Sequence, residues 1–240
     1  LNNIRTALQG QQGDRRLRLG IAGGEWKKMM ADATARTRFA SEVKKIIEQY
    51  DFDGVDFDFE WPANASEYNN YSATVIQMRS TLGKYVYFTA SLHPVSFKIS
   101  PEAIDALDFI SYQCYGPAVM RFPYEQFVKD GEAAVAYGIP KNKLVMGVPF
   151  YGSTGSLIAA YCDFVNDGLA TTNEDTYTYK GNTYTFNSIE TIRKKARYVC
   201  EEDYAGIMSW DLATDIDITN NKSLLKVIKE EFEYYANPTE

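Results

Sequence analysis

Five of the ten residues from Asp51 to Glu60 are carboxylates, in the run DFDGVDFDFE. The last three, Asp56, Asp58 and Glu60, alternate with apolar residues, and alternate side chains of a β-strand point to the same face. The spacing therefore predicts a strand with one acidic and one apolar face. Aligned carboxyl groups in a confined site repel one another, so at least one proton is expected to be kept or shared near neutral pH. A protonated carboxyl group is what a general acid needs.

Two other interpretations of the acidic face stay open. The first is the solvated side of an edge strand, but the apolar opposite face and the flanking helical patterns indicate a buried sheet. The second is a divalent-cation site. The oxygen ligands of such a site usually include carbonyls of a flexible loop, and the sequence indicates no such loop here.

Composition excludes several classes of function. The net charge is −7 and no basic run stands out, so nucleic acid is not expected as a partner. No apolar run reaches the ~18 residues of a membrane span. His93 is the only histidine and the three cysteines are widely spaced, so neither a Ser-His-Asp triad, a metal site nor a cofactor is expected. The 18 tyrosines, 13 phenylalanines and 3 tryptophans suit a carbohydrate cleft, but they suit ordinary packing equally well.

Short apolar runs alternate with amphipathic runs along the chain, which predicts βα units around a parallel sheet in a single domain, 1–240. Six strands are countable, at 17–23, 54–60, 85–92, 109–115, 143–150 and 205–210. Helices are predicted at 1–17, 36–50, 66–82 with Ser66 as its cap, 101–106, 124–138, 188–202 and 221–235. Residues 151–187 break this rhythm and are predicted to be a loop and hairpin insertion, with a turn at Lys180–Asn182.

The run DGVDFDFE, 53–60, resembles the Asp-Gly-x-Asp-x-Asp-x-Glu signature of glycoside hydrolase family 18, the chitinases and related endo-β-N-acetylglucosaminidases. The segments LGIAGGEW, SYQCYG, GVPFYG and AGIMSWDL follow in order and are similar to the third, sixth, seventh and eighth strands of that family. The resemblance implies an α/β fold, a (β/α) TIM-type barrel. The countable strands then match strands three to eight, and the first two βα units have no counterpart.

A parallel barrel without two neighbouring strands has open edges. We therefore expect six parallel strands in a curved sheet, with a gap between the strand at 17–22 and the strand at 205–210. Three explanations are open. The N-terminal part has been lost, the barrel is incomplete and inactive, or the chain self-associates so that another molecule covers the edge.

The resemblance also implies a mechanism. Glu60 would protonate the glycosidic oxygen and later act as a base, while the substrate's own N-acetyl oxygen attacks C1. Asp58 would accept a hydrogen bond from the acetamido N–H, and Asp56 would share a proton with Asp58 and hold it in place. Tyr112 would donate its hydroxyl to the acetamido oxygen. The anomeric configuration would be retained.

Five further residues are expected to contact sugar: Trp210 as the floor of the pocket, Gln113, Tyr151, Trp61 and Trp26. For Trp26 and Trp61 the alternative is packing at the barrel rim, and for Tyr151 a place in the core. Gln113 departs from the family pattern, which has Asp or Asn there. Its side chain is longer and carries no charge.

The expected activity is retaining hydrolysis of β-1,4 linkages after N-acetylglucosamine in chitin or its oligosaccharides. Hydrolysis of N-glycans and glycan binding without catalysis are the alternatives. Intact Glu60 and Asp58 favour an enzyme, whereas Gln113 and the missing strands favour a binding protein. The implied partner is an N-acetylglucosamine-containing oligo- or polysaccharide. The implied location is secreted, periplasmic or cell-surface, although the sequence has no signal-peptide pattern.

Overall fold

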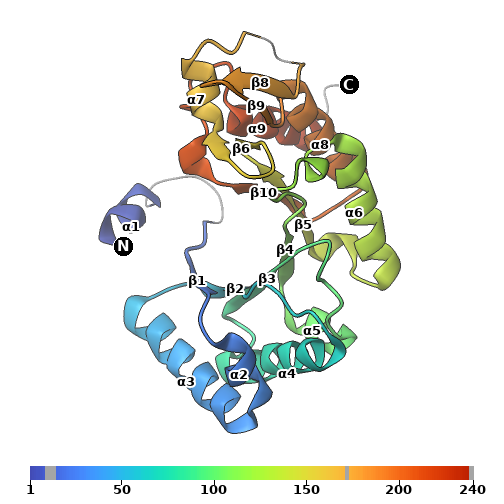
Figure 1. Ribbon diagram of the computed structural model, residues 1–240. Coiled ribbons are helices and arrows are strands. Elements are labelled where there is room, and N and C mark those ends of the chain that lie inside the picture. Colours follow the sequence, from blue (N-terminus) through green and yellow to red (C-terminus); the bar gives the residue numbers. More distant parts are fainter. Residues whose placement is uncertain (9–14, 171–172, 238–240) are drawn as a thin grey trace. The chain divides into compact units, whose positions relative to one another are not determined.

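The computed structural model describes residues 1–8, 15–170 and 173–237 (Figure 1). The chain divides into two units, which are described separately below. Unit 1 consists of residues 1–92 and 96–110, and unit 2 of residues 93–95 and 111–240. The division passes through strand β4 (Phe109–Tyr112).

Unit 1 alternates strands and helices. Strand β1 pairs with β2, and β2 with β3, both in parallel. Figure 1 shows α2, α3 and α4 on one side of these strands, and the three helices contact one another. The complete elements of this unit are α1 (Asn2–Leu8), β1 (Arg18–Ala22), α2 (Trp26–Ala31), α3 (Ala33–Tyr50), β2 (Gly54–Asp58), α4 (Ala65–Leu82), β3 (Tyr87–Leu92) and α5 (Pro101–Ala106).

The predicted apolar face of β2 is the centre of this unit's core. Val55 and Phe57 have no exposed surface. The ring of Phe57 packs against Phe39 of α3, Tyr71 of α4 and Phe88 of β3, with centroids 4.9 to 6.4 Å apart. Burial of one face against helices leaves the carboxylates of β2 on the opposite face of the sheet.

The helix bounds differ in detail from those predicted. Helix α4 is capped by Asn64, whose side chain accepts a hydrogen bond of 3.0 Å from the backbone N–H of Glu67, so the prediction of Ser66 as the cap was wrong. The helices α2 and α7 (Tyr161–Asn166) were not predicted. The helix predicted over 1–17 is present at Asn2–Leu8, residues 15–17 are not helical, and 9–14 lie outside the described residues.

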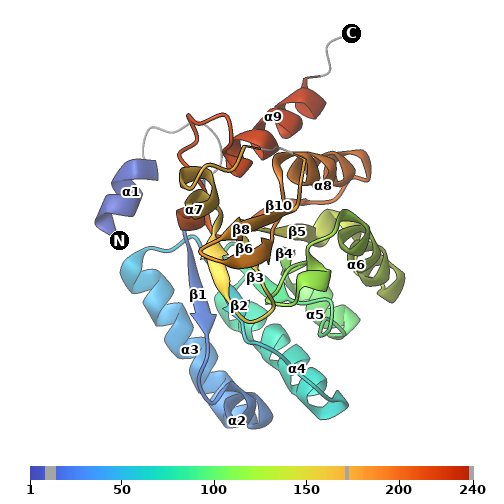
Figure 2. The ribbon, with the colours of Figure 1, turned by 45° about the horizontal axis from the view of Figure 1, so that its top comes forward.

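Unit 2 holds a parallel pair of strands, β5 and β10, and an antiparallel sheet with the order β7-β6-β9-β8. Helix α8 contacts both α6 and α9 (Figure 2). The elements after β4 are a 3₁₀ turn η1 (Val119–Arg121), α6 (Tyr124–Tyr137), η2 (Lys141–Lys143), β5 (Leu144–Pro149), β6 (Tyr151–Ser153), β7 (Ile158–Ala160), α7, β8 (Thr176–Tyr179), β9 (Asn182–Thr185), α8 (Ile189–Glu201), β10 (Gly206–Trp210), η3 (Leu212–Thr214) and α9 (Leu224–Ala236).

The predicted hairpin is confirmed as β8 and β9. Tyr179 pairs with Asn182, and the two residues between them, Lys180 and Gly181, have φ of 48° and 76°. Positive φ at both central residues is the geometry of a type I′ turn, which suits the twist of a two-residue hairpin.

All six predicted βα-type strands are present, as β1, β2, β3, β4, β5 and β10. Among the described residues of each unit, β1 pairs only with β2 and β10 only with β5. Covering of these edges by another molecule stays a prediction. None of the helices in the described part of the chain is both long and apolar enough to cross a membrane.

Lys195 places an amine inside the core of unit 2. The side chain of Lys195 on α8 has no exposed surface. Its Nζ donates to the carbonyl oxygen of Phe122 (2.8 Å) and to Oδ1 of Asn187 (2.7 Å), and it lies 5.0 Å from the ring centroid of Phe127. Burial lowers the pKa of this amine from 10.5 to about 8, because the charged form loses its hydration.

We expect Lys195→Met to remove a pH dependence of stability that the wild type has. Because the pKa is lower in the folded than in the unfolded state, the unfolded state binds more protons between these two values, and the wild type becomes more stable as pH rises through them. From pH 7 to pH 9 the wild type should gain about 1 kcal/mol relative to the variant, measured by urea unfolding. The control, Lys194→Met on the exposed side of the same helix, should keep the wild-type slope. If the free energies of unfolding of wild type and Lys195→Met differ by the same amount at every pH, the lowered pKa of Lys195 would be contradicted.

Candidate active site

The acidic face of β2 is partly exposed. Asp56 and Asp58 are half-buried, and Glu60 is exposed beyond the last residue of the strand. Register places Asp56 opposite Gly20 of β1 and Thr89 of β3. The carboxylates therefore lie along one face of β2, and Glu60 lies just beyond its carboxyl end. Enzymes with a βα barrel have their active sites at this end of the strands.

Asp56 is held by side chains from both neighbouring strands. Its Oδ2 accepts a hydrogen bond of 2.9 Å from Ser91, and its Oδ1 accepts one from Thr89. The same Oδ1 lies 3.3 Å from Nη1 of Arg18. Sequence reasoning missed these partners, because only the strand register brings the three side chains to Asp56. The expected sharing of a proton between Asp56 and Asp58 stays a prediction.

Tyr71 of α4 is a further group near the acid row that the sequence did not indicate. Its side chain is fully buried, and its hydroxyl has no hydrogen-bond partner among the described residues. Burial raises its pKa far above the usual value, and the negative charges of Asp56 and Asp58 raise it further. This phenol therefore keeps its proton near neutral pH.

The turn after Glu60 is fixed by contacts on both sides. Ser96 donates a hydrogen bond of 2.6 Å to the carbonyl oxygen of Pro62. Glu67, in the first turn of α4, forms an ion pair of 2.8 Å with Lys27 of α2. Both contacts tie the chain beyond Glu60 to its own unit, so Glu60 extends from an anchored backbone.

The two tryptophans of unit 1 differ in position. Trp61 follows Glu60 directly and is half-buried. Trp26 is only 8% exposed and packs against Phe59 and Tyr71, with centroids 5.8 and 6.3 Å away. Phe59 belongs to the apolar set of the alternating run, so Trp26 is not brought to the carboxylate face. Its position fits the packing alternative.

In unit 2, the expected sugar-contacting residues lie near the carboxyl ends of the strands. Tyr112 ends β4 and is fully buried, and Gln113 follows it with 7% of its surface exposed. Burial raises the pKa of Tyr112 well above its usual range, so its hydroxyl remains a donor. Gly147 of β5 allows the close approach of these strands, because a Cβ there would lie 2.6 Å from the carbonyl oxygen of Tyr112.

Tyr151 belongs to a small aromatic cluster that the sequence did not predict. Its ring stands nearly perpendicular to those of Tyr115 and Phe122, at 6.4 and 5.7 Å. Tyr115 in turn donates its hydroxyl to the sulfur of Met208 on β10 (3.5 Å). Tyr151 is 6% exposed, and burial raises its pKa to about 12. The cluster fixes the ring of Tyr151 while leaving a small part of it accessible.

Trp210 has the most open position of the predicted residues in unit 2. It is the last residue of β10, opposite Pro149 of β5, and 53% of its surface is exposed. Its carbonyl oxygen accepts a hydrogen bond of 2.8 Å from the N–H of Phe150. A large ring exposed at a strand's carboxyl end can serve as a stacking platform for a sugar ring.

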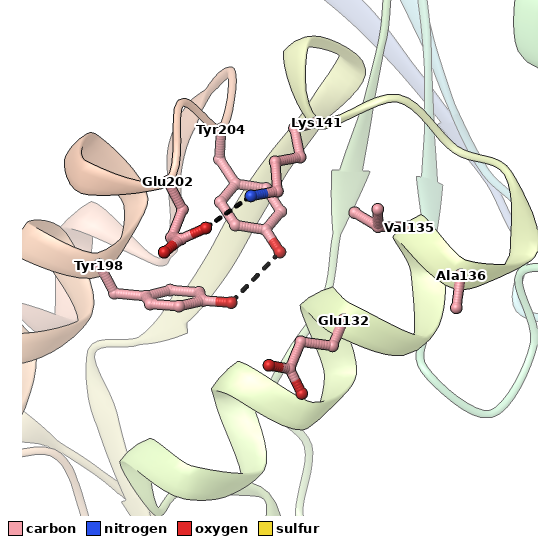
Figure 3. Close-up of a pocket in the computed structure, with 7 residues that line it drawn as sticks. All are labelled: Glu132, Val135, Ala136, Lys141, Tyr198, Glu202 and Tyr204. Atoms are coloured by element: carbon pink, nitrogen blue, oxygen red, sulfur yellow. Dashed lines mark hydrogen bonds and ion pairs between the residues drawn. The ribbon is translucent and has the colours of Figure 1, made fainter.

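A pocket of about 310 Å³ lies elsewhere in unit 2 (Figure 3). Lys141 and Glu202 form an ion pair of 2.6 Å there, and the hydroxyl oxygens of Tyr198 and Tyr204 are 3.4 Å apart. Lys141 precedes β5 and Tyr204 precedes β10, so the pocket lies at the amino ends of these strands. Active sites of βα barrels lie at the opposite, carboxyl ends of the strands. This pocket is therefore not the candidate active site. Its lining residues are Glu132, Val135, Ala136, Lys141, Tyr198, Glu202 and Tyr204.

Comparison with known proteins identifies the family and the fold. The sequence pattern of "Glycosyl hydrolases family 18" matches residues 6–215. "Probable chitinase 2" of Drosophila melanogaster is 23% identical over 297 residues, which cover 90% of this chain and 60% of that protein. The chain therefore spans less than two thirds of that relative's length.

Two solved structures have a similar fold. The GH18 chitinase ChiB of Flavobacterium johnsoniae superimposes with a TM-score of 0.81 at 26% identity, covering 96% of this chain and 79% of that one. The chitinase-like agglutinin of Robinia pseudoacacia superimposes with a TM-score of 0.72 at 18% identity, covering 90% and 81%. At 18% identity, the similarity to the agglutinin concerns the fold alone. The fold class is thus that of a (β/α) TIM-type barrel, of which the described residues form six parallel strands without a closed barrel, and the chain belongs to glycosyl hydrolases family 18.

Proposed function

We propose that this chain is a retaining glycoside hydrolase that cleaves β-1,4 linkages after N-acetylglucosamine in chitin or its oligosaccharides. The observation that carries the proposal is the acid row of β2. Asp56 is held by Thr89, Ser91 and Arg18, while Glu60 is exposed beyond the strand end. This arrangement combines a carboxyl group held in place with an exposed second carboxyl group.

In the proposed mechanism, Glu60 donates its proton to the glycosidic oxygen as the C1–O bond breaks. The acetamido oxygen of the substrate attacks C1 and gives an oxazolinium ion, and no protein nucleophile is used. Asp58 accepts a hydrogen bond from the acetamido N–H and stabilises the developing positive charge. Water then opens the ring, with Glu60 acting as the base, so that the β configuration is retained.

Residues of unit 2 are assigned to sugar binding. The hydroxyl of Tyr112 stays protonated and donates to the acetamido oxygen. Trp210 provides an exposed ring under the sugar, and Tyr151 and Gln113 contact its polar groups. Trp61 extends the binding surface beside Glu60. A polymeric substrate of this kind accords with the expected secreted, periplasmic or cell-surface location.

Glycan binding without catalysis is the second candidate. Gln113 favours it, because an uncharged and longer side chain stands where the family has Asp or Asn. One protein with a similar fold is named a chitinase-like agglutinin. Hydrolysis of N-glycans is a third outcome, which the same experiment covers.

The test is incubation with chitin hexasaccharide, cellohexaose and an N-glycopeptide, followed by mass spectrometry and proton NMR of the first product formed. We expect cleavage of the chitin oligosaccharide alone, with the β-anomer appearing first. Binding of chitin hexasaccharide without cleavage would support the lectin-like candidate. Release of the glycan from the glycopeptide would support the N-glycan activity, and an α-anomer as first product would contradict the retaining mechanism.

A further inference from the structure

We propose that Arg18 is a positioning residue of the acid row, which holds the carboxyl group of Asp56 in place as a hydrogen-bond acceptor. The inference rests on the proposed function, since it assigns Arg18 to the same site. Neither the run of carboxylates nor any other motif of the sequence indicates a role for this residue. The role is inferred from the contacts of Arg18 within unit 1.

Strand register places Arg18 on the carboxylate face. In the parallel pairing of β1 with β2, Arg18 is opposite Gly54, and Gly20 is opposite Asp56. Residues opposite one another point to the same face of the sheet, and so do alternate residues of one strand. Gly20 has no side chain, so the guanidinium of Arg18 is the group that β1 presents to Asp56.

The contacts of Arg18 form a closed set with Asp56. Its Nη1 lies 3.3 Å from Oδ1 of Asp56 and also donates to the hydroxyl of Thr89. The hydroxyl of Thr89 accepts from Arg18 and donates to Oδ1 of Asp56, with the more distant carbonyl oxygen of Val55 (3.4 Å) as a second acceptor. Ser91 donates to the other carboxylate oxygen at 2.9 Å. Asp56 is the acceptor in each of these contacts.

The guanidinium is itself held from the other side. It lies over the ring of Phe109, 4.8 Å from the centroid, and the side chain of Arg18 is 28% exposed. A cation stacked on an aromatic face has a restricted orientation. The contacts with Phe109 and Asp56 therefore hold the guanidinium of Arg18 beside the carboxyl group of Asp56.

The consequence concerns the protons of the acid row. Among the described residues, the charged or titratable groups with a recorded interaction here include Arg18 from β1, Asp58 on the same strand and the phenol of Tyr71 from α4, and β3 contributes the hydroxyls of Thr89 and Ser91. Removing the positive charge of Arg18 raises the affinity of the Asp56–Asp58 pair for protons. The pair then loses its proton, and so reaches the charge that catalysis requires, only at a higher pH.

The kinetic test compares Arg18→Met, Arg18→Lys and the control Arg16→Met. We expect the acid limb of kcat/KM for Arg18→Met to move to higher pH by about half a unit to one unit, a modest shift because the ion pair is partly exposed. Arg18→Lys should restore most of the wild-type profile. Arg16→Met removes the same charge two residues away, where the guanidinium lies 3.7 Å from the ring centroid of Tyr87, and should leave the profile unchanged.

A second measurement does not depend on catalysis. Carbon-13 NMR of the aspartate carboxyl groups, with Asp56 assigned through Asp56→Asn, follows protonation directly. We expect Asp56 to take up its proton at higher pH in Arg18→Met than in the wild type, and Arg18→Gln serves in the same way should Arg18→Met fail to fold. Identical titration in wild type and variant overturns the proposal. A shifted titration in a protein that cleaves no glycan supports the role of Arg18 while the proposed function fails.

Discussion

Replacing Glu60 with glutamine is expected to lower kcat on chitin hexasaccharide by at least about a hundredfold, while folding and oligosaccharide binding stay nearly unchanged. The substitution keeps the shape of the side chain and removes the proton that it transfers, and general acid–base catalysis typically contributes ~10²–10⁴-fold to the rate. Because Glu60 is exposed beyond the strand end, the change leaves no buried group unpaired. Stopped assays of product release and calorimetric binding of the substrate measure the two effects.

Glu25→Gln is the matched control for this variant. Glu25 is an exposed glutamate of the same unit that forms an ion pair of 2.8 Å with Lys28, three residues along the chain. The control should retain the wild-type rate. A Glu60→Gln variant with more than about a tenth of the wild-type rate would remove Glu60 from the role of general acid.

Replacing Asp58 with asparagine should be comparably severe, but through the acetamido group rather than the leaving group. Loss of the negative charge leaves the oxazolinium-like transition state without its electrostatic partner, and removal of such a group typically costs ~10²–10³-fold in kcat. The same mechanism predicts that oligomers of glucosamine or glucose, which lack the N-acetyl group, are not cleaved. A thiazoline mimic of the oxazolinium ion should bind the wild type far more tightly than substrate does.

Asp51→Asn provides the control in the same acidic run. Asp51 has a left-handed backbone, with φ of 53°, which asparagine adopts readily, so the fold should be unaffected. Comparable hydrolysis of N-acetylated and non-acetylated oligomers would contradict substrate assistance. Retention of activity in Asp58→Asn would contradict the assignment of Asp58.

The sequence by itself determined the features that depend on one element at a time. The alternation in 54–60 fixed which side chains of β2 are acidic and which enter the core, because a strand has a period of two. The alternation of apolar and amphipathic runs gave the six βα-type strands, and the residues Lys180 and Gly181 marked the hairpin turn, because each depends on local periodicity or turn chemistry. The signature of the family was likewise contained in one short run.

Tertiary structure decided which side chains meet. Arg18 and Thr89 are 38 and 33 residues from Asp56 along the chain, and only the register of β1, β2 and β3 brings them to its carboxylate. The position of Trp26 was decided in the same way. It follows a strand end, as a cleft residue would, but packing of α2 against α4 places its ring with Phe59 on the core side. Contacts between elements depend on register and on helix packing, which no local pattern of residues encodes.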